Sequence, residues 1–233
     1  MFLYGIVVEL YNQWRALKPE APFAGPGKSK HDMDDEDAES SKPARKRRGP
    51  RKATAQYLEN SAAHYLGRFA TSSAHLRQLM MMKVKRSETH HGTDPAEGAK
   101  FVDAIIAKFE RLGFLNDASY AEMRARSLHA RGTPLRGIRY KLGGKGIGED
   151  DIEAALTALE DEVRSNDLDL AAALVLARRR RLGPYLSDDR DTRDARRDKD
   201  MAVLARAGFS YDVVLQVLEA DSIEELELAV YGT

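Results

Sequence analysis

The sequence contains no cysteine among its 233 residues, which excludes a disulfide framework, a thiolate metal site and a thiol nucleophile. It also lacks a long hydrophobic run. The opening segment, MFLYGIVVELYNQW, holds an apolar run of roughly ten residues that Glu9 interrupts, whereas a membrane helix needs about 20. The segment has neither the basic start nor the cleavage site of a signal peptide. We therefore expect a soluble, cytoplasmic protein with no membrane contact.

Proline is scarce outside the first fifth of the chain. Five of the eight prolines precede residue 51, interleaved with an acidic cluster over residues 32–39 and a basic cluster over 45–52. Such a segment buries too little apolar surface to offset its ordering entropy. The sequence therefore predicts that residues 1–52 form a disordered or weakly ordered arm. Its basic run, KPARKRRGPRK, is typical of a non-specific nucleic-acid arm, or of a nuclear import signal in a eukaryotic host.

Strand-like alternation is missing beyond residue 53, where apolar residues recur at helical spacing,. Helix starts are marked by capping side chains: Asp94 before Pro95, Thr133 before Pro134, and Ser222 with Glu225,. These patterns predict an all-α protein.

The helical segments form three similar blocks. We predict helices near 55–68, 72–85 and 95–112, near 117–131, 134–145 and 149–160, and near 167–182, 191–207 and 211–220. Three-helix units of this size are too small to be robust alone, so neighbours should stack into an elongated array of helix-turn-helix-like repeats. The predicted repeats span residues 53–113, 114–165 and 166–222, followed by a C-terminal tail at 223–233.

Charge is balanced overall but unevenly distributed. Lysine and arginine number 37, as do aspartate and glutamate. Residues 120–147 carry seven basic side chains against Glu122, whereas residues 149–169 carry nine acids against Arg164. Segregated charge of this kind favours a polyanionic partner.

The basic block places its charge beside an apolar stripe. In a helix over 134–145, Leu135, Ile138 and Leu142 share one face, Arg136 and Arg139 flank it on one side, and Lys141 and Lys145 on the other,. The alternative is a solvated helix face, although such faces usually carry both charge signs. Arg178, Arg179, Arg180 and Arg181 form a second basic run at a predicted helix end, where capping accounts for one or two of them,. The remainder could contact phosphate or an acidic protein.

Several apparent functional motifs fail on spacing. GPGKS at 25–29 lacks the first P-loop glycine, and LGGKGIG at 142–148 lacks dinucleotide-binding spacing and reads as a helix end and turn,. His90 and His91, expected in a loop near Asp94, have no third metal ligand at a helpful spacing,. No catalytic residues can be placed. The sequence calls for no enzyme activity, no metal and no cofactor.

Two segments carry a resemblance to a known family. Residues 112–126 read LGFLNDASYAEMRAR, and residues 132–147 read GTPLRGIRYKLGGKGI. Together they resemble the central signature of the RecX family, regulators of the RecA recombinase. Asn116 replaces the first acid of the family's turn but preserves a capping side chain, and His75 stands where the family often has glutamate. The likeness covers about residues 55–220.

The resemblance implies a fold and a function. The fold would be a curved, all-α rod of three-helix repeats. The protein would bind the RecA–single-stranded DNA filament, block its growth and lower its ATP hydrolysis, strand exchange and co-protease activity. It would act as a monomer in homologous recombination, DNA repair and the SOS response, touching DNA directly or through RecA. The predicted RecA- and DNA-binding residues are Arg124, Arg126, Arg131, Arg136, Arg139, Lys141, Lys145, Arg178, Arg179, Arg180 and Arg181.

Two other functions stay open on the sequence. One is a direct DNA-binding helix-turn-helix protein that acts without RecA. The basic second block offers arginine and lysine but neither asparagine nor glutamine, which favours phosphate contact over sequence reading. The other is an interaction scaffold with no nucleic-acid role.

Overall fold

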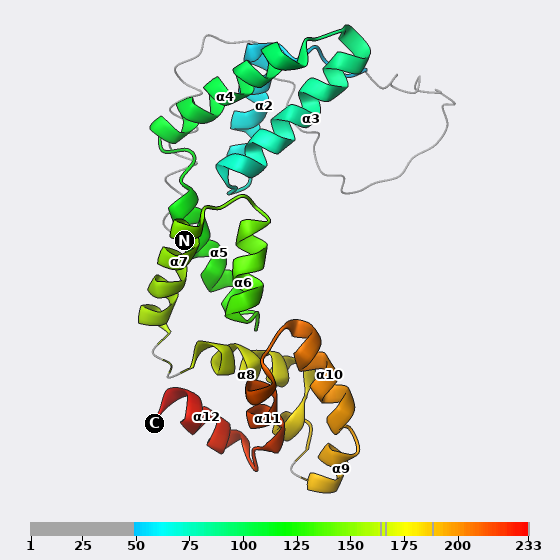
Figure 1. Cartoon of the computed structure of the whole chain (residues 1–233), viewed down its shortest axis with the longest axis vertical. Coiled ribbons are helices and arrows are strands. Elements are labelled where there is room, and N and C mark those ends of the chain that lie inside the picture. The colour runs from blue at the N-terminus through cyan, green and yellow to red at the C-terminus, as the bar shows by residue number, and fades with distance from the viewer. Residues whose placement is uncertain (1–48, 164, 166, 188, 233) are drawn as a thin grey trace, which may run out of the picture. The chain divides into compact units, whose positions relative to one another are not determined.

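The computed structural model describes residues 49–163, 165, 167–187 and 189–232. The predicted N-terminal arm lies outside these residues except for its last four. Every regular element in the described part of the chain is a helix, which confirms the all-α class (Figure 1). Internal contacts divide the chain into two units, which are described separately. The curved rod stays a prediction.

The first unit includes residues 49–69 and 80–102. It contains α2 (Ala55–Leu66), most of α3 (Ser73–His91) and the first half of α4 (Pro95–Arg111). Buried hydrogen bonds link its segments: the Ala53 amide donates to Ser87 Oγ at 2.8 Å, and Ser87 and Thr93 share a hydrogen bond of 2.6 Å. Satisfying these polar groups internally fixes the start of α2 against the end of α3.

The second unit holds residues 70–79 and 103–232. Its first three-helix group consists of α5 (Asp117–His129), α6 (Leu135–Gly143) and α7 (Glu149–Glu162). Apolar side chains at helical spacing from all three helices fill one core, which includes Ala125, Ile138, Leu142, Leu156 and Leu159. Burial of this stripe supplies most of the stability of helices this short.

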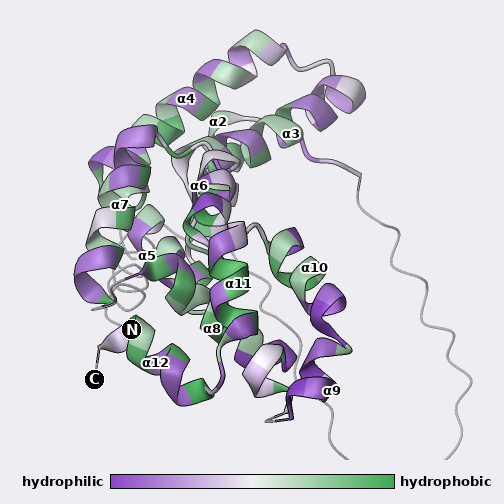
Figure 2. Cartoon of the chain, turned by 60° about the horizontal axis from the view of Figure 1, so that its bottom comes forward, coloured by the Kyte–Doolittle hydropathy of each residue, from purple (hydrophilic) through white to green (hydrophobic). Residues whose placement is uncertain are grey.

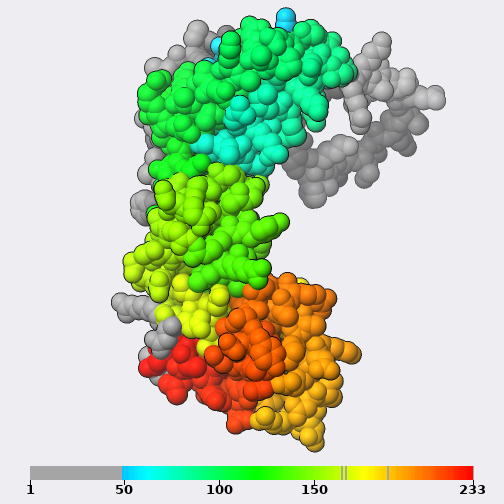
Figure 3. All heavy atoms as spheres, in the orientation of Figure 1, coloured from blue at the N-terminus to red at the C-terminus, as the bar shows by residue number. Residues whose placement is uncertain are grey.

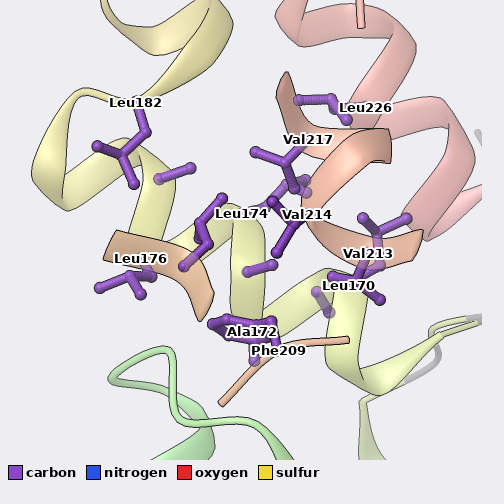
Figure 4. Packing of buried hydrophobic residues seen from close by; sticks show 14 of the residues in the cluster. Leu170, Ala172, Leu174, Leu176, Leu182, Phe209, Val213, Val214, Val217 and Leu226 are labelled. Atoms are coloured by element: carbon purple, nitrogen blue, oxygen red, sulfur yellow. The ribbon is translucent and has the colours of Figure 1, made fainter. Parts of the chain in front are cut away.

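The second group of this unit contains one 3₁₀ turn and five α-helices: α8 (Leu168–Arg180), η1 (Gly183–Tyr185), α9 (Arg190–Asp194), α10 (Arg197–Ala207), α11 (Tyr211–Glu219) and α12 (Ile223–Tyr231). Figure 4 shows Leu174, Val214 and Val217 meeting at its centre, with Leu226 of α12 directed at the same core. The C-terminal residues 223–231 are thus a packed helix, and Ser222 caps it by accepting from the Glu225 amide at 3.2 Å, as predicted.

Three local predictions were wrong. The helix predicted over 191–207 is two helices, α9 and α10, and His90 and His91 lie in the last turn of α3 instead of a loop. By contrast, α8 ends at Arg180, close to the predicted end near residue 182, and Arg181 after it adopts a left-handed φ of 55°. Thr133 does not cap α6: that helix begins at Leu135 with Pro134 before it and no local side-chain cap. The pattern of apolar residues does not reveal such ends because they depend on packing.

Distant aspartates accept hydrogen bonds from the first amides of two helices, α6, which has no local side-chain cap, and α3, which Ser72 also caps through the His75 amide. The Leu135 amide at the start of α6 donates to Oδ1 of Asp169 in α8 at 2.7 Å. The Ser73 amide at the start of α3 donates to Oδ1 of Asp117 in α5 at 2.8 Å. In both pairs a helix of one repeat is capped by the first helix of the next, so the orphan amides of the helix start also join neighbouring repeats.

Glycines close the same junctions. Gly132 has φ +76° and lies so close to α8 that an added Cβ would stand 2.8 Å from the Leu176 nitrogen. Gly146 has φ +73° and lies against Ala74, whose Cβ would be 2.4 Å from an added one. Only glycine combines this backbone conformation with so close an approach. The turn 142–148 is therefore a structural helix end, as the sequence predicted.

Candidate nucleic-acid interface

Helix α6 presents the predicted cationic side chains because its opposite face is held in the core. Ile138 and Leu142 have no exposed surface, while Arg136, Tyr140 and Lys141 are exposed. Residues four apart lie on the same side of an α-helix. Residues 138 and 142 therefore share the buried side, and residues 136 and 140 share the opposite side. Hydrophilic (purple) and hydrophobic (green) residues alternate along the helices in Figure 2. The hydrophobic stripe thus orients the charge outward.

Two of the predicted binding arginines are ion-paired within the fold. Arg139 pairs with Glu149 and Glu153 at the start of α7. Arg126 pairs with Glu122 at 3.3 Å and with Glu162 at 2.5 Å. Acids from the block 149–169 therefore offset part of the adjacent basic block. These two arginines are less available to a polyanion than the sequence suggests.

A third predicted residue, Lys145, takes part in a repeat junction. Its carbonyl accepts from Ser72 Oγ at 2.5 Å, and its Nζ lies 3.4 Å from Nε2 of His75. The side chain is only partly exposed. Lys145 therefore serves the packing of α3 against the end of α6.

Within the described residues, Arg124, Arg136 and Lys141 form no ion pair. Arg136 and Lys141 are exposed on α6, and Arg124 is partly exposed on α5. Between Leu135 and Gly148 the chain carries no acid at all. This part of the surface keeps its positive charge.

The junction between α5 and α8 brings the two predicted basic clusters together. Nη1 of Arg179 donates to the carbonyl oxygen of Arg131 at 2.9 Å, and Arg131 itself is exposed. Arg178, Arg180 and Arg181 are also exposed and have no carboxylate within ion-pair distance among the described residues. The clusters are 48 residues apart in sequence, yet they form one cationic zone at the C-terminal end of α8. Figure 3 shows the yellow segment of α8 directly against the green segment of α5–α7.

The charge of Arg178 also reaches Tyr185, which packs against the core around Leu174. Burial raises the pKa of Tyr185 above its ordinary value, and the carboxylate of Glu227 adds to the rise, while Arg178 opposes it. Tyr185 is therefore a neutral hydrogen-bonding group throughout the physiological pH range.

Tyr140 is a surface residue that sequence reasoning missed. Its side chain is 83% exposed, the most of any large hydrophobic or aromatic residue described as exposed. It lies one helical turn after Arg136 and next to Lys141. The signal was an aromatic residue between two cations on the polar side of the helical wheel.

Metal and membrane sites are not indicated by the described residues. They contain no group of three His, Cys, Asp or Glu side chains able to hold a metal ion. None of their helices is long and apolar enough to cross a bilayer.

The fold and surface define a class before any relative is considered. It is an all-helical protein that, within the described residues, carries arginines outside any ion pair on its second and third repeats and such a lysine, Lys141, on its second. Residues 116–156, which form α5, α6 and half of α7, match the family model described as "RecX, second three-helix domain". The cationic face of α6 lies inside this match.

Curated relatives extend the match over most of the chain. The chain is 39% identical over 180 residues to the regulatory protein RecX of Myxococcus xanthus, covering 76% of this chain and 94% of the relative. It is 30% identical over 171 residues to RecX of Agrobacterium fabrum, covering 73% and 86%. The chain belongs to the RecX family.

Solved structures include RecX from Lactobacillus salivarius, with 24% identity and a TM-score of 0.49 over 75% of this chain and 97% of the other. A second RecX crystal structure has 23% identity and a TM-score of 0.47 over 71% of each chain.

Proposed function

We propose that this chain regulates the RecA recombinase by binding the RecA–single-stranded DNA filament. Binding stops filament growth and lowers ATP hydrolysis and strand exchange. In this proposal the protein works in the cytoplasm as a monomer, with no catalytic step of its own, in recombination, DNA repair and the SOS response. Membership of the RecX family supports the regulatory class.

The observation that carries the proposal is the set of cations left without acidic partners. Among the residues that the structure describes, Arg136 and Lys141 on α6 are exposed and form no ion pair, in a stretch without acids. Charge that the fold does not neutralise attracts a polyanion and speeds its association. A filament of recombinase on DNA offers phosphates and acidic protein surface to such a face.

Paired variants test this role. Arg136→Ala with Lys141→Ala removes two unpaired cations, whereas Arg126→Ala with Arg139→Ala removes two cations that already face acids. Both changes remove the same formal charge. Exposed ion pairs contribute only about 0–1 kcal/mol each, so both variants should fold and melt near the wild type.

The assay is RecA ATP hydrolysis on single-stranded DNA, titrated with this protein at substoichiometric ratios. The wild type should inhibit, the Arg136/Lys141 variant should need a much higher concentration, and the Arg126/Arg139 variant should stay close to the wild type. Equal inhibition by all three proteins would remove the α6 cations from the site. Absence of inhibition by the wild type would refute the proposal itself.

A separate binding measurement distinguishes the rival helix-turn-helix function. A direct DNA reader binds labelled duplex at physiological salt without RecA, and it needs side chains that read base edges. The filament regulator should not bind duplex in this way, and its binding to single-stranded DNA should become stronger when RecA and ATP are present.

A further inference from the structure

The exposed ring of Tyr140 has no packing role that explains it. Its 83% exposure means that almost none of its apolar surface is buried by the fold. An aromatic ring left in water among cations is the arrangement that single-strand binding proteins use, because every base has a face that can stack.

The surroundings of the ring match that use. Arg136 lies one turn before Tyr140 on the same side of α6, and Lys141 adjoins it,. Gly143 and Gly144 follow at the end of the helix, and an added Cβ on Gly143 would meet nothing within 4 Å. No protein atom therefore crowds the helix surface at Gly143, three residues after the exposed ring, and cations lie near the ring for the flanking phosphates.

The equivalent helices of the other repeats lack this combination. Buried residues align the three helices α3, α6 and α10 with one another. Met80, Leu142 and Leu204 follow each other at intervals of 62 positions, and each is at most 1% exposed. The same offset places Gln78 and Ala202 where α6 has Tyr140.

At the place of Arg136, the same register has Ala74 in α3 and Asp198 in α10. Helical packing alone therefore requires neither the tyrosine nor the arginine. The pair belongs to the second repeat only.

We propose that the outer face of α6 binds single-stranded DNA directly by stacking an unpaired base on the ring of Tyr140, while Arg136 and Lys141 bind the adjoining phosphates. Bases in a duplex are already stacked on one another, so this contact selects single strands. This contact deepens the proposed function, and its role in the cell rests on that function. The binding of the strand itself requires no RecA. The contact would let the protein recognise the DNA strand inside or at the end of a filament.

Direct binding of a fluorescently labelled strand, without RecA, tests the proposal. The strand has about 16 nucleotides, the upper end of a single-strand site, and mixed sequence. A second strand of the same length and charge carries abasic sites throughout. Tyr140→Ala should weaken binding of the normal strand roughly 5- to 150-fold, the range for loss of one stacked base. Tyr140→Phe should bind like the wild type.

Three controls separate stacking from charge. Tyr211→Ala removes another exposed tyrosine, 63% exposed on α11 beside Asp212, and should leave affinity unchanged. Arg136→Gln should lower the slope of log affinity against log salt by about 0.7, the value for one phosphate of a single strand. Tyr140→Ala should leave that slope intact. The wild type should bind the abasic strand more weakly than the normal strand, by the same factor by which Tyr140→Ala weakens binding of the normal strand.

Two results would overturn the proposal. One is equal affinity of Tyr140→Ala and the wild type for the normal strand. If that variant nevertheless fails to inhibit RecA, then the ring contacts protein, and the regulatory function stands without the DNA contact. The other is a wild-type affinity that is the same for normal and abasic strands, which would reduce the site to phosphate binding.

Discussion

Replacing Gly132 with alanine should open the junction between α5 and α8. The glycine has φ +76°, and its Cα faces the backbone of α8. An added Cβ would stand 2.8 Å from the Leu176 nitrogen, 2.9 Å from the Ala172 oxygen and 3.0 Å from Leu176 Cβ. Two of these neighbours are backbone atoms of a helix, so no side-chain rotation relieves the contact.

The expected loss has two parts. A left-handed backbone costs a non-glycine residue about 1–2 kcal/mol. Forcing a methyl group into a packed contact costs about 1–3 kcal/mol more, because α8 or the turn has to move. Gly132→Ala should therefore lower the free energy of unfolding by roughly 2–5 kcal/mol, with loss of the Arg179–Arg131 hydrogen bond that spans the same junction,.

Gly113→Ala is the matched control. Gly113 has φ +74°, nearly that of Gly132, but an added Cβ would meet nothing within 4 Å. Both changes remove the same freedom from the unfolded chain, so that effect cancels in the comparison. Gly113→Ala should lose only the conformational part, about 1–2 kcal/mol.

Urea unfolding followed by circular dichroism gives the two free energies. Gly132→Ala should be less stable than Gly113→Ala by about 1–3 kcal/mol, or by several degrees in a thermal melt, since 1 kcal/mol shifts the midpoint of a chain this size by about 2–4 °C. Equal losses for both variants would show that α8 does not approach Gly132 as closely as the structure has it.

Two further stability effects follow from capping. Asp169→Ala should cost about 1 kcal/mol, the usual value of an N-cap, because the Leu135 amide loses its acceptor; Asp169→Asn, which keeps an acceptor oxygen, should lose less in the same urea assay. Hydrogen bonds from Thr192 hold the pKa of Asp189 below its ordinary value of 3.8. The charged carboxylate therefore stabilises α9 above that pH, and this contribution disappears as pH falls through the lowered pKa. Asp189→Ala should consequently be less stable than the wild type at neutral pH, and the two proteins should converge in acid.

Much of the fold follows from local pattern. The predicted helix over 149–160 is α7 at Glu149–Glu162, and that over 95–112 is α4 at Pro95–Arg111. Asn116 caps α5, as expected, by accepting from the Ser119 amide at 2.9 Å. Helical periodicity and caps depend on neighbours within a few residues, and the sequence displays those neighbours directly.

Local sequence pattern predicted only part of the functional surface. The block 120–147 was recognisable by its excess of basic residues, and the resemblance of its motifs led to the right family. Its members nevertheless differ once folded: Arg139 faces Glu153 of α7, whereas Arg136, three residues earlier, faces no acid among the described residues. A count of charges along the chain treats the two arginines alike.

By itself, the sequence determined most of the helices and the basic character of residues 120–147, because each is a property of residues close together in the chain. Only the tertiary structure decided which cations stay unpaired, which aspartate caps which helix, and that Arg131 meets Arg179 across 48 residues. Those contacts depend on how one helix packs against another, where an ion pair or a hydrogen bond joins groups that the linear order keeps apart.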